Sequence, residues 1–166
     1  MLALQKRREG IGNIELVDVP MPELRPNEVL MKVWAAGVCG SDLLIQEDKH
    51  FYKAPVTIGH EYSGIVAEIG SQVKTVKIGD KIVSDIETSD GWIGVSRNGA
   101  YTSYVAVPEE QVYVFSGKAN LDHMCFAEPV VATFHAMHKV GDFVVIVGPG
   151  PMGLLGVQFA KLCGAK

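Results

Sequence analysis

Four side chains of the types that bind zinc occur in this sequence: Cys39, the adjacent pair His60 and Glu61, and Glu128. Zinc sites that do chemistry use three protein ligands of the Cys, His, Asp and Glu types and leave one position open for water or substrate. Cys39, His60 and one of Glu61 or Glu128 would supply such a set. Spacing alone leaves other interpretations open, since Cys39 can be a small buried apolar residue and His60-Glu61 a solvated or capped pair.

A second candidate for chemistry is the glycine run at 148–153, which has the pattern Gly-x-Gly-x-x-Gly. When such a run follows a strand and opens a helix, its glycines permit a tight turn, a close approach to a pyrophosphate and close helix packing. The helix N-terminus then offers free N–H groups to the phosphates. The alternative is a glycine turn that joins any strand to any helix. The predicted cofactor-binding residues are Gly148, Gly150, Pro151, Met152 and Gly153.

The elements that would position these residues follow two patterns. Up to about residue 115, short segments rich in β-branched and aromatic residues, such as 28–34, 64–70 and 101–107, predict a mainly β domain, a barrel or a sandwich. Residues 143–147 are continuously apolar, as in a parallel strand covered on both faces. A connecting helix is expected from 128 to 139, and another from Pro151 to about Gly164.

Composition excludes several classes of protein. A net charge of −4 over 166 residues offers no basic patch for nucleic acid. The longest apolar runs are far shorter than the roughly 18 residues of a membrane helix. Three cysteines and an N-terminus without a signal-peptide pattern predict reduced thiols in the cytoplasm.

Four motifs occur in a fixed order along the chain. They are Ala36-Gly37-Val38-Cys39-Gly40-Ser41-Asp42, Gly59-His60-Glu61-Tyr62-Ser63-Gly64-Ile65-Val66, Glu128-Pro129 and the glycine run. In these motifs the chain resembles the zinc-dependent medium-chain alcohol and polyol dehydrogenases, and the resemblance extends from about residue 1 to the end. It implies a GroES-like β-barrel catalytic domain over 1–139, including the connecting helix, and the first strand and helix of a Rossmann domain over 140–166.

The resemblance also assigns roles to site residues. Cys39 and His60 are expected as zinc ligands, and Glu61 and Glu128 both belong to the site, one of them binding directly. Alcohol dehydrogenases with two cysteine ligands have their second cysteine at the position of Glu128. The polyol and threonine branches resemble this chain in having a glutamate there. Ser41 matches the hydroxyl that receives the substrate proton, although it could instead cap a helix beginning near Asp42.

Further expectations follow for the relay, the pocket and the metal content. The relay histidine of many relatives is replaced by Leu44, so the proton must leave by another path, for which His50 is a weak candidate. Phe51 and Trp92 are candidate walls of the substrate pocket. Residues 84–98 contain no cysteine, so one catalytic zinc and no structural zinc is expected.

The resemblance implies hydride transfer between an alcohol or polyol and a nicotinamide cofactor. NAD and NADP are not distinguished. The acidic residue that binds the ribose is expected about 20 residues beyond the glycine run, which is past Lys166. A homo-oligomer is possible. Because one strand and one helix cannot form a dinucleotide domain, the chain is interpreted as a fragment or a minimised form of such an enzyme. The alternatives are a non-catalytic, possibly metal-binding GroES-like module and, more weakly, a zinc-free quinone-reductase relative.

Overall fold

The computed structural model describes the chain except for residues 119, 138–140, 142 and 166, and it divides into two compact units, Met1–Cys125 and Phe126–Lys166. The predicted domain boundary at 139/140 lies outside the described residues and stays a prediction. No helix in the described part of the chain is long and apolar enough to cross a membrane.

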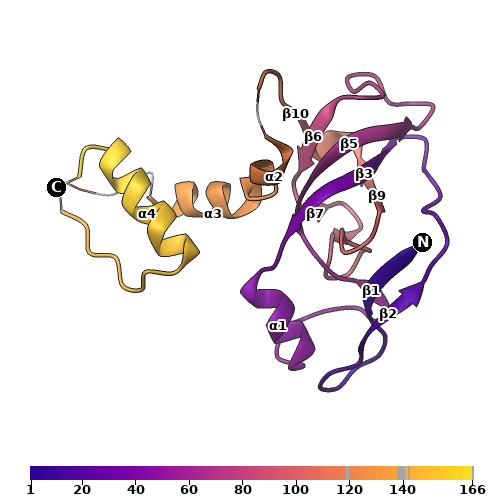
Figure 1. The fold of residues 1–166 in the computed structure, drawn as a ribbon, viewed down its shortest axis with the longest axis horizontal. Coiled ribbons are helices and arrows are strands. Elements are labelled where there is room, and N and C mark those ends of the chain that lie inside the picture. Colours follow the sequence, from indigo (N-terminus) through magenta and orange to yellow (C-terminus); the bar gives the residue numbers. More distant parts are fainter. Residues whose placement is uncertain (119, 138–140, 142, 166) are drawn as a thin grey trace. The chain divides into compact units, whose positions relative to one another are not determined.

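The first unit is built from strands and a few short helices, as the sequence predicts (Figure 1). Its main sheet has five antiparallel strands in the order β10-β6-β5-β3-β9, and a second sheet has the order β2-β1-β4. The strands of the two sheets are β1 (Leu2–Lys6), β2 (Ile14–Asp18), β3 (Glu28–Gly37), β4 (Val56–Thr57), β5 (Glu61–Ile69), β6 (Lys81–Ser84), β9 (Tyr104–Pro108) and β10 (Val112–Val114). The shorter elements are α1 (Gly40–Gln46), the hairpin β7 (Glu87–Thr88) and β8 (Gly91–Trp92), the 3₁₀ turn η1 (Glu109–Gln111) and α2 (Leu121–Met124).

The segment before β9 joins the two sheets. The Leu4 N–H donates to the Tyr101 carbonyl over 2.9 Å, and Ala3 forms a bridge with Thr102. A core of apolar side chains, among them Met31, Val66 and Ile82, fills the space behind the main sheet. The two sheets are therefore connected between β1 and the segment before β9, which supports the predicted barrel.

Ionic groups hold the loops of this unit. The Lys6 side chain is fully buried, and its ammonium donates to the carbonyls of Gly10 over 2.6 Å and Gly12 over 2.8 Å. Arg97 bridges two carboxylates, with 2.7 Å to Glu28 and 2.7 Å to Asp90. Arg97 belongs to the run 84–98, which contains no cysteine, and its contact with Glu28 connects this run to β3.

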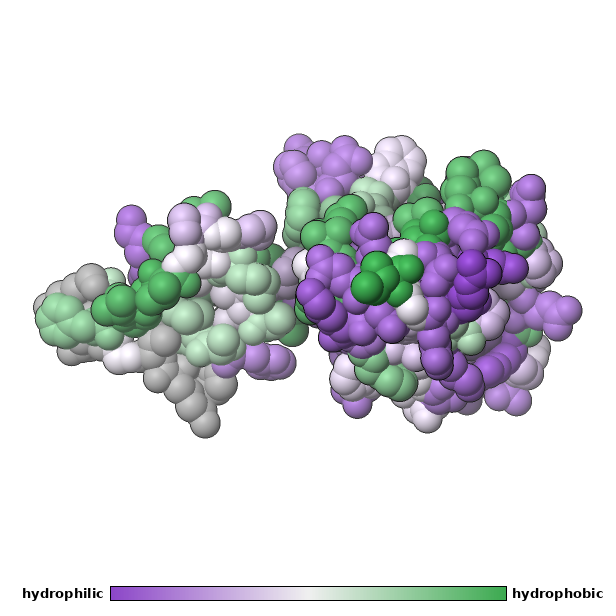
Figure 2. Space-filling view, turned by 90° about the horizontal axis from the view of Figure 1, so that it is seen from below, coloured by the Kyte–Doolittle hydropathy of each residue, from purple (hydrophilic) through white to green (hydrophobic). Residues whose placement is uncertain are grey.

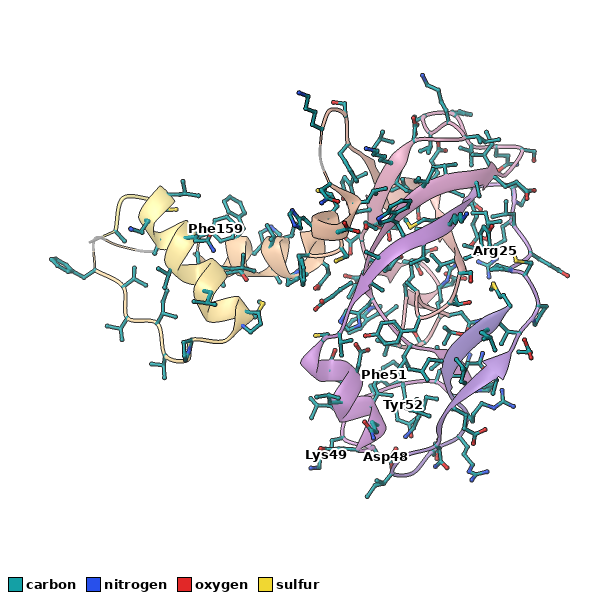
Figure 3. The ribbon with its side chains drawn as sticks, in the orientation of Figure 1. Arg25, Asp48, Lys49, Phe51, Tyr52 and Phe159 are labelled. Carbon is teal, nitrogen blue, oxygen red and sulfur yellow. The ribbon has the colours of Figure 1, made fainter. Side chains whose placement is uncertain are left out.

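The second unit is a pair of helices, α3 (Ala127–Met137) and α4 (Pro151–Leu162), which pack against each other. Phe134 and Phe159 meet edge to face at 5.5 Å between ring centroids, and Figure 3 labels Phe159 on α4. Pro151 is the first residue of α4, and Gly164 follows the helix at φ +88°, as the sequence predicts.

The segment 143–147 differs from the prediction in its hydrogen bonding. It belongs to no sheet among the described residues. A parallel strand forms only when a neighbouring strand supplies its hydrogen bonds, and no such neighbour is present in the described part of the chain. Its burial also differs from the predicted cover on both faces: Ile146 approaches Gly156 of α4, whereas Val145 is 90% and Val147 is 95% exposed. Hydrophobic residues are correspondingly prominent on the face of this unit seen in Figure 2, whereas hydrophilic residues dominate that of the first unit.

Candidate metal centre

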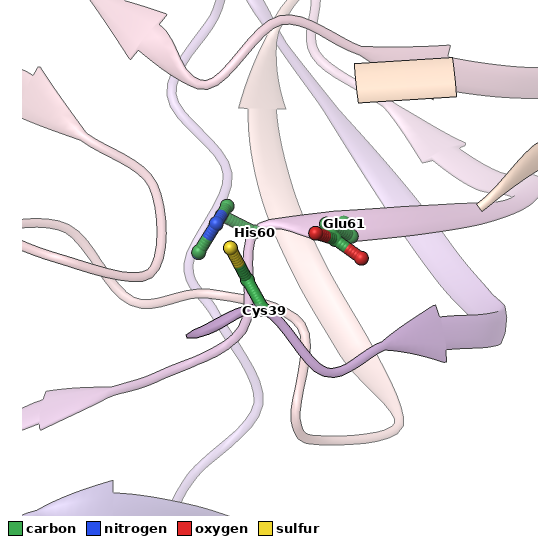
Figure 4. A group of neighbouring side chains, drawn as sticks. All are labelled: Cys39, His60 and Glu61. Carbon is green, nitrogen blue, oxygen red and sulfur yellow. The ribbon is translucent and has the colours of Figure 1, made fainter. Parts of the chain in front are cut away.

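Three of the four predicted ligands converge in the first unit. Cys39, His60 and Glu61 each offer one ligand atom, and these atoms all lie within 4.8 Å of one another. Figure 4 shows the Cys39 sulfur directed toward the His60 ring, with Glu61 at the start of the neighbouring strand. Zinc bonds of about 2.0–2.3 Å in a tetrahedron hold ligand atoms about 3.3–3.8 Å apart, so small side-chain movements would complete the set.

Backbone geometry explains how neighbouring residues can serve one site. Successive side chains of a strand point to opposite faces, but β5 begins at Glu61, and His60 lies before it. Gly59 has φ +96° and turns the chain immediately before His60. Gly37, paired with Glu61 across β3 and β5, has no side chain, and a Cβ there would lie 2.3 Å from the Glu61 Oε2. The two glycines therefore let His60 and Glu61 reach the cysteine.

Cys39 occupies the turn between β3 and α1. It is the N-cap residue of α1, and its N–H donates to the Asp42 Oδ2 over 3.0 Å. Ser41 consequently lies inside the helix, so the alternative that Ser41 is the N-cap is wrong. The Ser41 Oγ is 3.4 Å from the His60 Nε2, which brings the predicted proton acceptor to the cluster.

Asp42 is a site residue that the sequence analysis missed. Its carboxylate is buried, and its Oδ1 lies 3.6 Å from the His60 Nδ1. Both atoms are buried, and neither has a hydrogen-bond partner among the described residues. An acid in the third position of a helix often reaches back to the N-cap N–H, so the spacing from Cys39 to Asp42 held a signal for it.

The charges at the cluster fit a cation. Glu61 and Asp42 are both buried, at 7% and 4% exposure, and within the described ranges neither forms an ion pair with a lysine or arginine. Buried carboxylates are normally paired or bound to a metal. The outer nitrogen of a metal-binding histidine normally donates to a carboxylate, and the Asp42 Oδ1 faces the His60 Nδ1 at 3.6 Å, slightly beyond hydrogen-bond distance. The donor set and the two unpartnered atoms therefore fit a bound Zn²⁺.

The roles of the other predicted residues stay predictions. Glu128 lies in the first turn of α3 in the second unit, and its ligand role stays a prediction. The Nδ1 of His50 donates to the carbonyl of Phe51 over 2.7 Å, and no hydrogen bond of His50 to Ser41 is present among the described residues. Phe51, labelled beyond α1 in Figure 3, is 66% exposed and Trp92 is 45% exposed, and their pocket role stays a prediction.

The glycine run has the local geometry that the motif requires. Gly148 has φ +102°, Gly150 is the N-cap of α4, and Pro151 takes the first helical position. A Cβ on Gly153 would lie 1.9 Å from the Gly148 carbonyl oxygen, so only glycine fits the third position. The hydroxyl of Thr133 approaches the Met152 sulfur at 3.4 Å, which links the run to α3.

Comparison with known proteins agrees with this architecture. A family profile described as "Alcohol dehydrogenase GroES-like domain" matches residues 25–117. The chain belongs to the zinc-type medium-chain alcohol dehydrogenase family. This confirms the family and the fold class: a GroES-like domain followed by the start of a Rossmann domain.

Individual relatives cover the whole chain. The chain is 32% identical to the D-arabitol-phosphate dehydrogenase of Enterococcus avium and 33% identical to the sorbitol dehydrogenase of Halalkalibacterium halodurans, in each case over 99% of the chain and 54% of the relative. It also resembles the structure of a proposed zinc-binding dehydrogenase of Sinorhizobium meliloti 1021 bound to NADP, with a TM-score of 0.91 and 33% identity over 99% of the chain and 54% of that structure. The chain therefore spans about half the length of these relatives.

Proposed function

We propose that the chain carries the catalytic zinc centre of an alcohol or polyol dehydrogenase that uses NAD or NADP. The observation that carries the proposal is the convergence of Cys39, His60 and Glu61 within 4.8 Å at a buried, negatively charged cluster. Glu128 is proposed as the remaining acid of the site, binding directly or exchanging with Glu61. A zinc ion held there would act as a Lewis acid that favours the ionised form of an alcohol near neutral pH.

Ser41 is proposed to receive the proton of the substrate hydroxyl. A serine hydroxyl both accepts and donates a hydrogen bond, as a proton carrier requires. Its Oγ lies at the cluster, 3.4 Å from the His60 Nε2, and the residue is partly exposed. Because Leu44 cannot carry a proton and no hydrogen bond joins His50 to Ser41 among the described residues, we propose that Ser41 passes the proton directly to solvent.

The glycine run is proposed to bind the pyrophosphate of the cofactor. The turn at Gly148 and the free N–H groups at the start of α4 are suited to a phosphate, and the hydride would pass to the nicotinamide of the same cofactor. The NADP in the Sinorhizobium meliloti structure and the polyol substrates in the names of the relatives support this class of reaction.

A second candidate is a non-catalytic GroES-like module that binds metal without turnover. Residues 143–147 have no neighbouring strand among the described residues, which favours this candidate. The two functions differ in one outcome, which is whether the zinc-loaded chain reduces a nicotinamide cofactor.

The test is reduction of NAD or NADP by the zinc-loaded 166-residue chain with a panel of polyols, secondary alcohols and threonine. We expect turnover with at least one alcohol and a loss of about 10²–10⁴-fold in kcat for Ser41→Ala, the usual contribution of a positioned proton acceptor. Ser71→Ala, at an exposed turn, is the matched control and should leave kcat unchanged. No turnover by zinc-loaded wild type would favour the inert module.

A further inference from the structure

Tyr101 lies beside the candidate metal centre without belonging to its ligand set. Its hydroxyl is 2.7 Å from the Asp42 Oδ2 and 2.8 Å from the Gly37 carbonyl oxygen, so its single proton is offered to two acceptors. Its ring packs on Gly59, where a Cβ would lie 2.4 Å from the Tyr101 Cδ1. The Tyr101 side chain thus contacts the segment before Cys39 at Gly37, the helix α1 at Asp42, and the residue before His60 at Gly59.

The hydroxyl bears on the orientation of the Asp42 carboxylate. Two donors converge on its Oδ2, the N–H of Cys39 at 3.0 Å and the hydroxyl of Tyr101 at 2.7 Å. The other oxygen, Oδ1, is left facing the His60 Nδ1 with no competing donor among the described residues. Occupation of Oδ2 therefore keeps Oδ1 directed at the histidine.

That orientation decides which nitrogen of His60 is available to a metal. A carboxylate oxygen facing Nδ1 favours the tautomer with a proton on Nδ1, and the lone pair then lies on Nε2. Burial and the hydrogen bond to Asp42 raise the pKa of Tyr101 well above its usual range, so the hydroxyl keeps its proton at neutral pH. The hydroxyl therefore has a proton to donate to Asp42 at neutral pH.

We propose that Tyr101 is a positioning residue that strengthens zinc binding by holding Asp42 in the orientation that directs the His60 Nε2 to the metal. The inference rests on the zinc centre proposed above. It assigns the Tyr101 hydroxyl a role distinct from that of its ring, which packs on Gly59. Tyr101→Phe keeps the ring and removes only the hydroxyl, so it separates the two roles.

The experiment measures the Zn²⁺ affinity of the full chain by competition with a chromophoric chelator. Loss of an outer hydrogen bond around a metal site typically weakens binding about 10–100-fold, and we expect about 10-fold for Tyr101→Phe. The matched control is Tyr62→Phe, which removes another buried hydroxyl, bonded at 2.5 Å to the Ser84 Oγ and not to Asp42. The control should bind zinc as wild type does.

A double-variant cycle tests whether Tyr101 acts through Asp42. We expect Asp42→Ala to weaken zinc binding, and Tyr101→Phe to add no further loss in the Asp42→Ala background. Wild-type affinity in Tyr101→Phe, or losses that multiply in the double variant, would overturn the proposal. If Asp42→Ala does not fold, the absorption spectra of the cobalt-loaded proteins decide, since an altered thiolate band is expected in Tyr101→Phe and an unchanged one would overturn the proposal.

The wild-type measurement separates this inference from the function on which it rests. A wild-type chain that binds no zinc overturns the metal centre and, with it, the role of Tyr101. A wild-type chain that binds zinc tightly while Tyr101→Phe binds it equally well overturns only the role of Tyr101.

Discussion

Gly59 is a position at which a single methyl group should disturb the surroundings of the candidate centre. An alanine there must adopt φ +96°, and its Cβ would lie 2.4, 2.7 and 2.8 Å from three atoms of the Tyr101 ring. Gly79 provides a matched control, because it has φ +92° and no atom within 4 Å of a built Cβ. The difference between the two variants therefore isolates the clash from the backbone conformation.

The expected loss in the free energy of unfolding is the sum of a backbone contribution and a clash contribution. A left-handed conformation costs a non-glycine residue about 1 kcal/mol, which is the whole expected effect of Gly79→Ala. Overpacking against a rigid ring adds about 1–3 kcal/mol, so Gly59→Ala should lose about 2–4 kcal/mol. At about 3 °C per kcal/mol for a chain of this size, the expected losses in Tm are about 3 °C for Gly79→Ala and about 6–12 °C for Gly59→Ala.

The assay is urea denaturation followed by tryptophan fluorescence. Both tryptophans of the chain, Trp34 and Trp92, lie in the first unit, so the signal reports on the unit that contains the clash. Zinc affinity should also fall in Gly59→Ala and not in Gly79→Ala, because the displaced ring lies beside Asp42 and His60. Equal stability losses in the two variants, within about 0.5 kcal/mol, would refute the reasoning.

Three further predictions concern the rest of the chain. Lys6→Met should cost about 2 kcal/mol in urea denaturation, because two partly buried carbonyls lose their donor; a change below about 0.5 kcal/mol would contradict this. Hydrogen bonding to Arg25 lowers the pKa of Asp90 to about 2. The ionised Asp90 carboxylate therefore stabilises the folded chain by about 1 kcal/mol after the discount for solvent exposure. This stabilisation is present above about pH 4 and is lost toward pH 2. The stability gap between wild type and Asp90→Asn should therefore close over that range, and a gap that widens on acidification would disprove the assignment. Gly153→Ala should reduce the helical circular dichroism signal, whereas Gly150→Ala, with nothing within 4 Å, should reduce it less; equal losses would argue against the close packing of the third glycine.

The fold could be predicted where local pattern determines structure. The strands at 28–34 and 64–70 form parts of β3 and β5, and Pro151 and Gly164 mark the ends of the second helix. The segment 143–147 was predicted as a strand from its apolar pattern, but a sheet hydrogen bond also needs a neighbouring strand, which the pattern of one segment cannot supply.

The site could be predicted by residue type but not in its supporting contacts. Cys39 and His60 are recognisable because few side chains bind zinc, and the structure brings them together with Glu61. Asp42 carried a weak local signal through its helix position. Tyr101 carried none, because its contact with Asp42 depends on how the loop before β9 folds over α1 and not on any spacing in the sequence.

The most direct test of the account is the zinc content of the purified, reconstituted chain, measured by elemental analysis for wild type, Cys39→Ser and His60→Ala. We expect about one bound zinc per wild-type chain and a large loss of zinc in both variants, since each lacks one of only a few protein ligands. Full retention of zinc in both variants would contradict a centre built on Cys39, His60 and Glu61.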